Sequence, residues 1–504
     1  MATLSKEDEK KEVADRDSEI MKVDSETRGD LGDQHSDPST ILTPADNRRL
    51  LLRSDLVVLP ILTLAAFFAA LDKNALGYAA VFGIRQDAGL IGQEYSWLGS
   101  IVYFGFLIMQ FPNMWLLIKV PPGTYMAILV MVWGILLLCI GAASNFAGLA
   151  TIRFFLGIFE AGQLPVSMIL TSIWYRREEH ALRTAIWYNT FAGIFGGILS
   201  YAIGHIQSSL PIWKVLFLIY GSVTLAFGVI VFFALPNSPS TAWFYNDRDR
   251  QLVVIRTADN NTSSRSIAPW KLAQVLEALR DPKYWVICVQ TMAWAIVNSG
   301  ITNFNPLIIS GYGFTQMKTT LMATPQAAVA FVSQVIFAGI AYFIPNIRCA
   351  IWIGSTLPAL AGAIMINTLD ISQYRTASLA GVYMMGFYNV AWIMMMSLVA
   401  SNNGGATKRS FASVSVALVY AVGNIIGPQF FRSEQAPHYP LGIYAMMASF
   451  AVEIACGAVY WSLCVIQNRS RDREYGKPQT GVNIAIEGVD DLTDGNNPNF
   501  RYAM

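Results

Sequence analysis

The sequence predicts an all-α membrane protein with twelve transmembrane helices arranged as two six-helix halves. Three observations support this fold class. The chain of 504 residues is 54% hydrophobic and only 14% charged, whereas soluble domains carry about 25% charged residues. Apolar stretches long enough to cross a bilayer, about 20 residues each, recur along the chain. One long polar segment divides them into two equal sets.

The twelve predicted spans follow one another with short connections. In the first half, 55–235, they cover 55–72, 95–118, 123–143, 148–174, 184–207 and 214–235. In the second half, 283–466, they cover 283–309, 322–344, 350–369, 374–400, 412–432 and 441–466. Direct sequence similarity between the halves is faint, but six spans, a linker and six spans is the layout of the major facilitator fold. The substrate site of that fold lies between the halves near the membrane midplane.

The segments outside the two halves are polar. Residues 1–54 lack the apolar core of a signal peptide, and their composition predicts a disordered cytoplasmic tail. The polar composition of residues 236–282 predicts a cytoplasmic linker with a short amphipathic helix at 269–280. Residues 467–504 predict a second cytoplasmic tail, also disordered because it is as hydrophilic as the first.

Lysine and arginine are concentrated in the loops on the side of the two termini. The opposite loops hold far fewer: Arg85, Lys214, Lys318, Arg375 and Arg432. By the positive-inside rule, this bias places both termini in the cytoplasm.

Four ionisable residues fall inside spans of the first half. Asp72 and Lys73 close the first span, and Arg153 and Glu160 lie in the fourth. Burying such a group in a spanning helix costs about 2.5–3.5 kcal/mol, so each needs a partner or a function. Arg153 and Glu160 share one helix face about 10 Å apart, too far to pair directly. We expect Arg153 to pair with Asp72, and Glu160 to pair with Lys73 or to stay protonated.

These four residues have two interpretations. A carboxyl group that alternates between water and a cation as the halves rock can carry a proton, which predicts a proton-coupled transporter. Alternatively, they form a static charge network that packs the first half, although such networks are weak evidence for stability. For Glu453 in the twelfth span the structural interpretation is favoured, since one acid near a helix end can form local hydrogen bonds.

The second half carries amides and aromatic rings in place of charges. They are Asn298, Asn303 and Asn305 in the seventh span, and Tyr383, Tyr388, Asn389, Trp392, Ser401 and Asn402 in and after the tenth. Amides can bind a substrate or join helices, and the sequence leaves both readings open. Glycine-rich runs in the fifth and eleventh spans predict close helix packing.

No enzyme or cofactor signature is present. The sequence contains no HExxH, GxSxG or P-loop motif, and its five cysteines and four histidines have no metal-binding spacing. The net charge of +1 gives no indication of a nucleic-acid partner. The sequence therefore predicts no enzymatic activity, no cofactor and no metal.

Several longer motifs occur in a fixed order. The first half contains LDKNALGYA, QFPN, RFFLGIFEAGQLP, SIWYRREEHALRTA, WKVLFLIYG and LPNSPSTAWF. The second half contains NFNPLIISGYGF, SNNGGATKRSFASVSV, GNIIGPQFF and APHYPLG. Through these motifs the chain resembles the anion:cation symporter family of the major facilitator superfamily over 55–466. The resemblance is strongest to the fungal branch of allantoate and nicotinate permeases.

This resemblance implies proton-coupled transport of an organic anion, often a carboxylate or a vitamin, by a monomer in the plasma membrane. It implies that Asp72 and Glu160 are the proton sites, that Lys73 helps to hold a substrate carboxylate and that Arg153 belongs to the same network. The predicted substrate-binding residues are Lys73, Arg153, Asn74, Asn303, Asn389, Trp392 and Asn402. The predicted partners are a small solute, protons and the lipid bilayer.

The chain departs from the family at several positions. Lys73 stands where the family usually has arginine, whose bidentate fork a lysine cannot reproduce, and Phe106 stands where tyrosine is usual. Between the second and third spans the usual charged loop is reduced to Lys119. These departures favour an alternative function, import or export of a fungal secondary metabolite or its precursor. A nutrient receptor that signals through its tails is disfavoured, because neither tail nor linker is large enough for a signalling domain.

Overall fold

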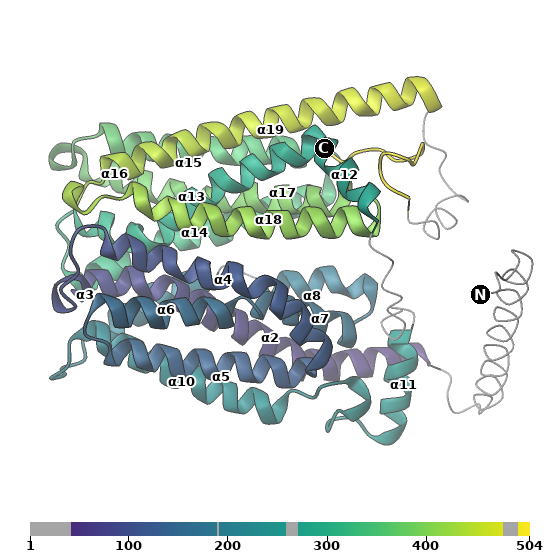
Figure 1. The fold of residues 1–504 in the computed structure, drawn as a ribbon, viewed down its shortest axis with the longest axis horizontal. Coiled ribbons are helices and arrows are strands. Elements are labelled where there is room, and N and C mark those ends of the chain that lie inside the picture. The colour runs from purple at the N-terminus through teal and green to yellow at the C-terminus, as the bar shows by residue number, and fades with distance from the viewer. Residues whose placement is uncertain (1–41, 189–190, 259–270, 477–491) are drawn as a thin grey trace, which may run out of the picture.

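The structure, a computed structural model, describes residues 42–188, 191–258, 271–476 and 492–504 (Figure 1). The described part is helical. The first half contains α2 (Pro44–Val81), α3 (Ile84–Asp87), α4 (Glu94–Lys119), α5 (Pro122–Ala142), α6 (Phe146–Glu160), α7 (Gln163–Trp174), α8 (His180–Trp187), α9 (Ala192–Ile203) and α10 (Ile212–Ala234). The linker contains α11 (Asp247–Ala258) and α12 (Leu272–Arg280).

The second half contains α13 (Pro282–Ser310), α14 (Gln316–Phe343), α15 (Arg348–Thr368), α16 (Ile371–Met384), α17 (Tyr388–Asn402), α18 (Ala406–Ile426) and α19 (Pro440–Tyr475). Short 3₁₀ turns lie at Arg177–Glu179, Pro239–Thr241, Met385–Phe387, Gly427–Phe430 and Ser433–Gln435. The predicted amphipathic helix in the linker is confirmed as α12.

Eleven of the twelve predicted spans are found among the described residues. Ten helical segments are long and apolar enough to cross a membrane, and α4 makes an eleventh although it is bent by 55° next to Pro112. Proline explains the bend because it removes a backbone donor from the helix. The predicted span 184–207 corresponds to α8 and α9, which lie on either side of residues 189–190, outside the described residues. A continuous fifth span, and with it the count of twelve, stays a prediction.

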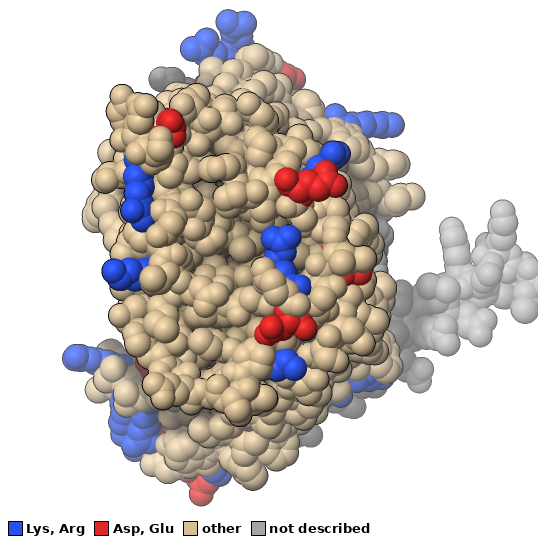
Figure 2. All heavy atoms as spheres, turned by 90° about the vertical axis from the view of Figure 1, so that its left-hand side faces the viewer, with Lys and Arg blue, Asp and Glu red and all other residues tan. Residues whose placement is uncertain are grey.

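The two halves lie side by side with their long helices roughly parallel (Figure 1). We call the end that carries α11, α12 and Met504 the proximal end, and the end that carries α3 and the start of α16 the distal end. Figure 2 looks onto the distal end, where charged side chains are scattered over a mostly uncharged surface.

Hydrogen bonds join the two halves near the distal end. The Tyr95 hydroxyl donates to the Asn303 carbonyl at 2.8 Å, and the Ser96 hydroxyl donates to the Phe431 carbonyl at 3.1 Å. Further bonds connect Arg85 to Tyr439, Gln93 to Gln429, Ser100 to Ile425 and Ser433 to Gly92. This end of the bundle is therefore held closed.

Each linker helix is attached to its own half. On α11, the buried Asp249 accepts from Arg49 at 2.5 Å and from Arg53 at 2.7 Å, and both arginines lie on α2. On α12, the Gln274 side-chain oxygen accepts from the Thr407 and Lys408 amides at the start of α18, each at 3.1 Å. The first half therefore holds α11 and the second half holds α12.

The two polar tails differ from the prediction. Residues 1–41 lie outside the described residues, and the first helix begins at Pro44, where Thr43 caps it, rather than at residue 55. The prediction was wrong for residues 492–504, which pack on the second half and bury Asp494 and Tyr502. The hydrophilic composition of this segment is typical of a disordered tail, but its polar groups form hydrogen bonds and ion pairs with the folded bundle.

The glycine-rich runs bring helices close together, as predicted. A Cβ on Gly197 of α9 would lie 2.3 Å from Thr324 Oγ1 of α14, across the two halves. A Cβ on Gly427, at the end of α18, would lie 1.9 Å from Ser299 Oγ of α13. Only a missing side chain permits contacts of this kind.

We predict that Gly427→Ala lowers the thermal unfolding temperature of the detergent-purified protein by several degrees. The added methyl group must displace Ser299, and overpacking of this kind costs about 1–3 kcal/mol. Gly339→Ala is the control, because nothing lies within 4 Å of a Cβ at Gly339. Equal unfolding temperatures for the two variants would contradict the packing assigned to Gly427.

Candidate functional site

The four charged residues of the first half line one small cavity. Asp72 and Lys73 reach it from α2, and Arg153 and Glu160 reach it from α6. Its other lining residues are Gly99, Val102 and Tyr103 on α4, Leu156 on α6, and Thr302 and Asn303 on α13. The cavity thus lies between the two halves, with a volume of about 10 Å³.

The ion pairs expected from the sequence are not formed. Among the described residues, no ion pair within 4.0 Å joins Asp72 to Arg153 or Lys73 to Glu160. Arg153 instead donates from Nε to the Leu98 carbonyl of α4 at 2.7 Å. Both carboxyl oxygens of Asp72 are buried and have no hydrogen-bond partner within the described ranges. The two predicted ion pairs are therefore wrong, because a backbone carbonyl and the second half supply the partners of the two cations. The alternative for Glu160, that it stays protonated, remains a prediction.

Lys73 reaches across to the second half. Its ammonium donates to the Tyr420 hydroxyl of α18 at 2.5 Å. It also lies 5.2 Å from the centre of the Tyr420 ring and 5.7 Å from that of Tyr103. Aromatic faces attract a cation, so tyrosines hold the charge of Lys73, and no carboxylate in the described part of the chain lies within ion-pair distance of it.

Tyr420 belongs to an aromatic wall made of Trp294, Tyr388, Trp392 and Tyr420. The Trp294 and Trp392 rings are stacked with centres 4.2 Å apart, and Tyr388 stacks on Trp294 at 5.5 Å. Tyr420 lies 5.9 Å from Trp392. The sequence indicated Tyr388 and Trp392 as candidate residues but not Trp294 or Tyr420. The wall combines residues of α13, α17 and α18, so no single span shows its pattern in the sequence.

The break between α6 and α7 positions Glu160. It is the last residue of α6, and α7 resumes at Gln163. At the break, a Cβ on Gly162 would lie 2.9 Å from the Tyr125 hydroxyl and 3.0 Å from Asn113 Oδ1. The motif EAGQLP therefore ends one helix beside the cavity and starts the next against α4 and α5.

The predicted amides divide into two groups. Asn303 lines the cavity and donates to the Ser299 carbonyl at 2.9 Å. Asn74 and Asn389 are not among the lining residues, and Asn74 donates to the Ala70 carbonyl of its own helix at 2.7 Å. Asn402 lies elsewhere, bonded to Tyr460 and to the backbone of Ala503. The prediction of Asn402 as a substrate residue is therefore not supported by its position.

Other polar residues of the spans join helices. Asn298 donates to Asn424 at 2.9 Å, and Asn305 donates to Gln326 at 2.8 Å. Glu453 is fully buried on α19 and accepts from Gln290 of α13 at 3.1 Å. These contacts agree with the structural interpretation of Glu453 and place it outside the cavity.

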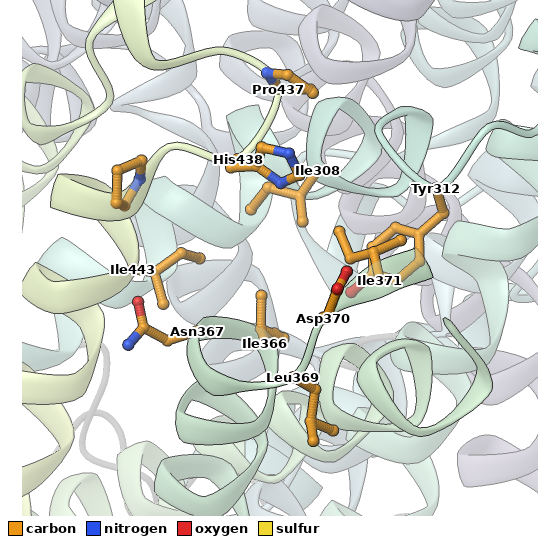
Figure 3. A pocket seen from close by; sticks show the side chains of 11 residues that line it. Ile308, Tyr312, Ile366, Asn367, Leu369, Asp370, Ile371, Pro437, His438 and Ile443 are labelled. Carbon is orange, nitrogen blue, oxygen red and sulfur yellow. The ribbon is translucent and has the colours of Figure 1, made fainter. Parts of the chain in front are cut away.

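A larger cavity of about 220 Å³ lies at the distal end of the second half (Figure 3). His438 and Asp370 approach it from opposite walls. Asp370 accepts from the Ser372 amide at 2.9 Å and hydroxyl at 2.8 Å, and these bonds hold the pKa of its carboxyl below the usual range. Its carboxylate thus caps α16, and the cavity borders only the second half, so the cavity between the halves is the better candidate site.

A bundle of membrane-spanning helices in two halves, with buried charges between them, defines a membrane transporter rather than an enzyme. The model of the Major Facilitator Superfamily matches residues 62–428, and the chain belongs to this family.

Three known proteins illustrate the relationship. The chain is 34% identical over 471 residues to an uncharacterized transporter of Schizosaccharomyces pombe, covering 93% of this chain and 89% of the relative. It is 30% identical over 483 residues to the allantoate permease of Saccharomyces cerevisiae, covering 92% and 88%. A crystal structure of a D-xylose–proton symporter shares the fold, with a TM-score of 0.60 and 12% identity over 80% of this chain and 96% of the other. The two fungal relatives confirm the predicted resemblance to the fungal allantoate permease branch.

We predict that Asp72→Leu does not lower the thermal unfolding temperature. An unpartnered buried carboxyl contributes no ion pair, whereas breaking a buried ion pair costs about 3–5 kcal/mol. Asp249→Leu, which removes the buried partner of Arg49 and Arg53, is the control and should lower the temperature clearly. A comparable loss for Asp72→Leu would mean that Asp72 is paired after all.

Proposed function

We propose that the chain is a secondary active transporter that moves a small organic anion, coupled to protons, by alternating access of the two halves. The observation that carries the proposal is the cavity between the halves, where buried Arg153 and half-buried Lys73 have no carboxylate of the described residues within ion-pair distance. A carboxylate- or vitamin-like solute fits this site best.

The charge balance of the cavity supports an anionic solute. Arg153 is 5% exposed and Lys73 is held by tyrosine hydroxyl and ring contacts. A buried cation is costly until an anion or a set of hydrogen bonds compensates it. A substrate carboxylate placed between Lys73 and Arg153 would supply that anion, and the aromatic wall beside Lys73 would hold the apolar part of the solute.

The carboxyl groups support proton coupling. An ionised Asp72 with neither oxygen partnered would cost much more to bury than its neutral acid. We propose that Asp72 holds a proton in this conformation and releases it when water reaches the site. Glu160, which lines the same cavity, is the second proposed proton site.

The closed distal end supports alternating access. A cavity of about 10 Å³ has room for about one water molecule, so the halves must separate to admit a solute. The distal hydrogen bonds are side-chain contacts that can break without unfolding a helix. Transport then consists of opening one end of the bundle while closing the other.

The positions at which the chain departs from the family pattern favour a second candidate solute. Lys73 donates to Tyr420, and the ring of Phe106 lies 6.5 Å from the ring of Tyr420. Both departures therefore contact the same part of the aromatic wall, as expected if the site has been rebuilt for another solute. The alternative function is import or export of a fungal secondary metabolite or its precursor.

We also propose a monomer in the plasma membrane with both termini in the cytoplasm. The excess of lysine and arginine in the loops on the side of the termini supports this orientation. The proximal end then faces the cytoplasm, and the closed distal end faces outward.

We predict that proteoliposomes containing the protein accumulate an organic anion in response to an inward proton gradient. Allantoate and a panel of other small carboxylates are the probes. Uptake should rise as the outside pH falls, because protons bind on the entry side. Asp72→Asn and Glu160→Gln should abolish gradient-driven accumulation, whereas exchange of labelled for unlabelled solute at equal pH should persist in at least one of them.

Glu453→Gln is the matched control, since it neutralises a buried acid outside the cavity and should keep the proton dependence. Uptake that is independent of pH in the parent protein, or coupling that survives in both Asp72→Asn and Glu160→Gln, would contradict the proposal. Metabolite profiles of cells lacking and overproducing the protein then separate import from export.

A further inference from the structure

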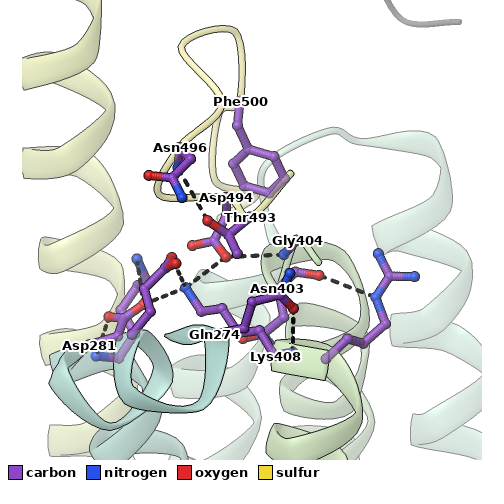
Figure 4. Close-up of polar contacts among 12 residues, drawn as sticks. Gln274, Asp281, Asn403, Gly404, Lys408, Thr493, Asp494, Asn496 and Phe500 are labelled. Atoms are coloured by element: carbon purple, nitrogen blue, oxygen red, sulfur yellow. Dashed lines mark hydrogen bonds and ion pairs between the residues drawn. The ribbon is translucent and has the colours of Figure 1, made fainter. Parts of the chain in front are cut away.

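Residues 492–504, which we call the C-terminal strap, cross the proximal end of the second half (Figure 4). The strap has no regular secondary structure, yet Thr493, Asp494 and Tyr502 are each less than 5% exposed. None of its residues lines the cavity between the halves. Its burial therefore calls for a role other than substrate binding.

The carboxylate of Asp494 occupies an anion-binding cradle. Its Oδ1 lies 2.7 Å from the Lys408 ammonium and accepts from the Gly404 amide at 3.1 Å. Its Oδ2 accepts from the Tyr502 hydroxyl at 2.8 Å. An ammonium, a backbone amide and a hydroxyl thus surround a carboxylate whose side chain is only 1% exposed.

The cradle explains the two glycines of the motif SNNGGATK. A Cβ on Gly404 would lie 2.4 Å from the Asp494 backbone nitrogen, so a side chain there would push the strap away. Gly405 has a φ of +81°, which favours glycine, and packs against the Gln274 side chain. One glycine admits the strap and the other admits the linker helix α12.

The end of the strap is fastened by a second set of contacts. The Tyr502 ring lies 3.4 Å from the Lys283 ammonium, and the Tyr502 backbone exchanges two hydrogen bonds with the Asn468 side chain. The Ala503 backbone exchanges two with Asn402, and the Met504 carbonyl accepts from the Arg348 amide at 2.9 Å. The strap therefore joins α13, α15, α17, α18 and α19.

Undocking of the strap would not leave Lys408 alone. Its ammonium also lies 3.0 Å from Glu277 and 3.7 Å from Asp281. Removing one of the three carboxylates therefore avoids the large penalty of an uncompensated buried charge. Release of the strap would therefore leave Lys408 with two carboxylates nearby.

The strap and the candidate site share one helix. Lys408 lies in the first turn of α18, and Tyr420, which holds Lys73, lies 12 residues further on, about 18 Å along the same helix. Gln274 of the linker also binds the start of α18. The position of this helix end thus depends on the strap and the linker together.

We propose that residues 492–504 are a releasable intramolecular strap, whose docking in the cradle of Gly404 and Lys408 fixes the proximal end of α18 and thereby controls transport. The docking of the strap is inferred from contacts in the structure and does not depend on the proposed function. The control of transport rests on the proposed function, so the two parts need separate measurements.

Buried Cys464 reports on docking, because it belongs to the same apolar cluster as Tyr502. In a protein that keeps Cys464 and has its other four cysteines replaced by alanine, a membrane-impermeant maleimide is applied to detergent-purified, monodisperse protein. Asp494→Asn should speed the labelling of Cys464 by about tenfold or more, since a charge-assisted bond worth that factor is lost. Gly404→Ala should do the same by steric exclusion of the strap.

Two matched controls should label at the parent rate. Asp247→Asn neutralises an aspartate that is 96% exposed on α11, and Gly354→Ala adds a methyl group where nothing lies within 4 Å. Parent-like labelling in both Asp494→Asn and Gly404→Ala would overturn the docked strap.

The control of transport is measured as solute exchange in proteoliposomes, with allantoate and the carboxylate panel as probes. Asp494→Asn and Gly404→Ala should each change the exchange rate at least about threefold relative to their controls, because release of the strap shifts the balance of conformations. Faster labelling with parent-like exchange would overturn the control of transport. Failure of the parent to carry any probe would count against the proposed function, while the labelling comparison would still decide docking.

Discussion

The hydrogen bond from Lys73 to Tyr420 is the contact that joins the charged residues of the first half to the aromatic wall of the second half. It places a cation of the first half against the aromatic wall of the second, at the level of Asp72 and Arg153. Because charged groups are costly in an apolar bundle, this bond couples the charge state of the cavity to the relative position of the halves. In the proposed transport cycle, a solute anion that draws Lys73 toward itself would weaken the same bond and so would loosen the contact between the halves.

The helix α18 connects the candidate site to the proximal end. Its first turn is held by the linker through Gln274 and by the strap through Lys408 and Asp494, and its later turns carry Tyr420. Near its distal end, the Ile425 carbonyl accepts from Ser100 of α4 at 2.7 Å. One helix thus contacts the linker, the C-terminal segment, the candidate site and the opposite half.

Hydropathy and charge pattern predicted the spans and the meeting of Asp72, Lys73, Arg153 and Glu160 because both depend on residue type and spacing. The partners of these residues could not be predicted, since the Leu98 carbonyl and the Tyr420 hydroxyl become available only through tertiary packing. The strap was missed for a related reason. Its polar composition is typical of a disordered tail, and only the folded helix ends provide the cradle that orders it. Asn402 was assigned to the substrate site because its actual partner, the Ala503 backbone of the strap, becomes available only in the folded protein.

The separate attachment of the two linker helices also bears on how such a protein can evolve. Arg256 of α11 binds Glu179 between the fourth and fifth spans, and Glu277 of α12 binds Lys408 between the tenth and eleventh. At the corresponding place in each half, one ion pair thus fastens the linker helix that belongs to that half. Because these two ion pairs share no residue with the cavity or the aromatic wall, a substitution at Lys73 or Phe106 leaves the attachment of each linker helix to its own half unchanged.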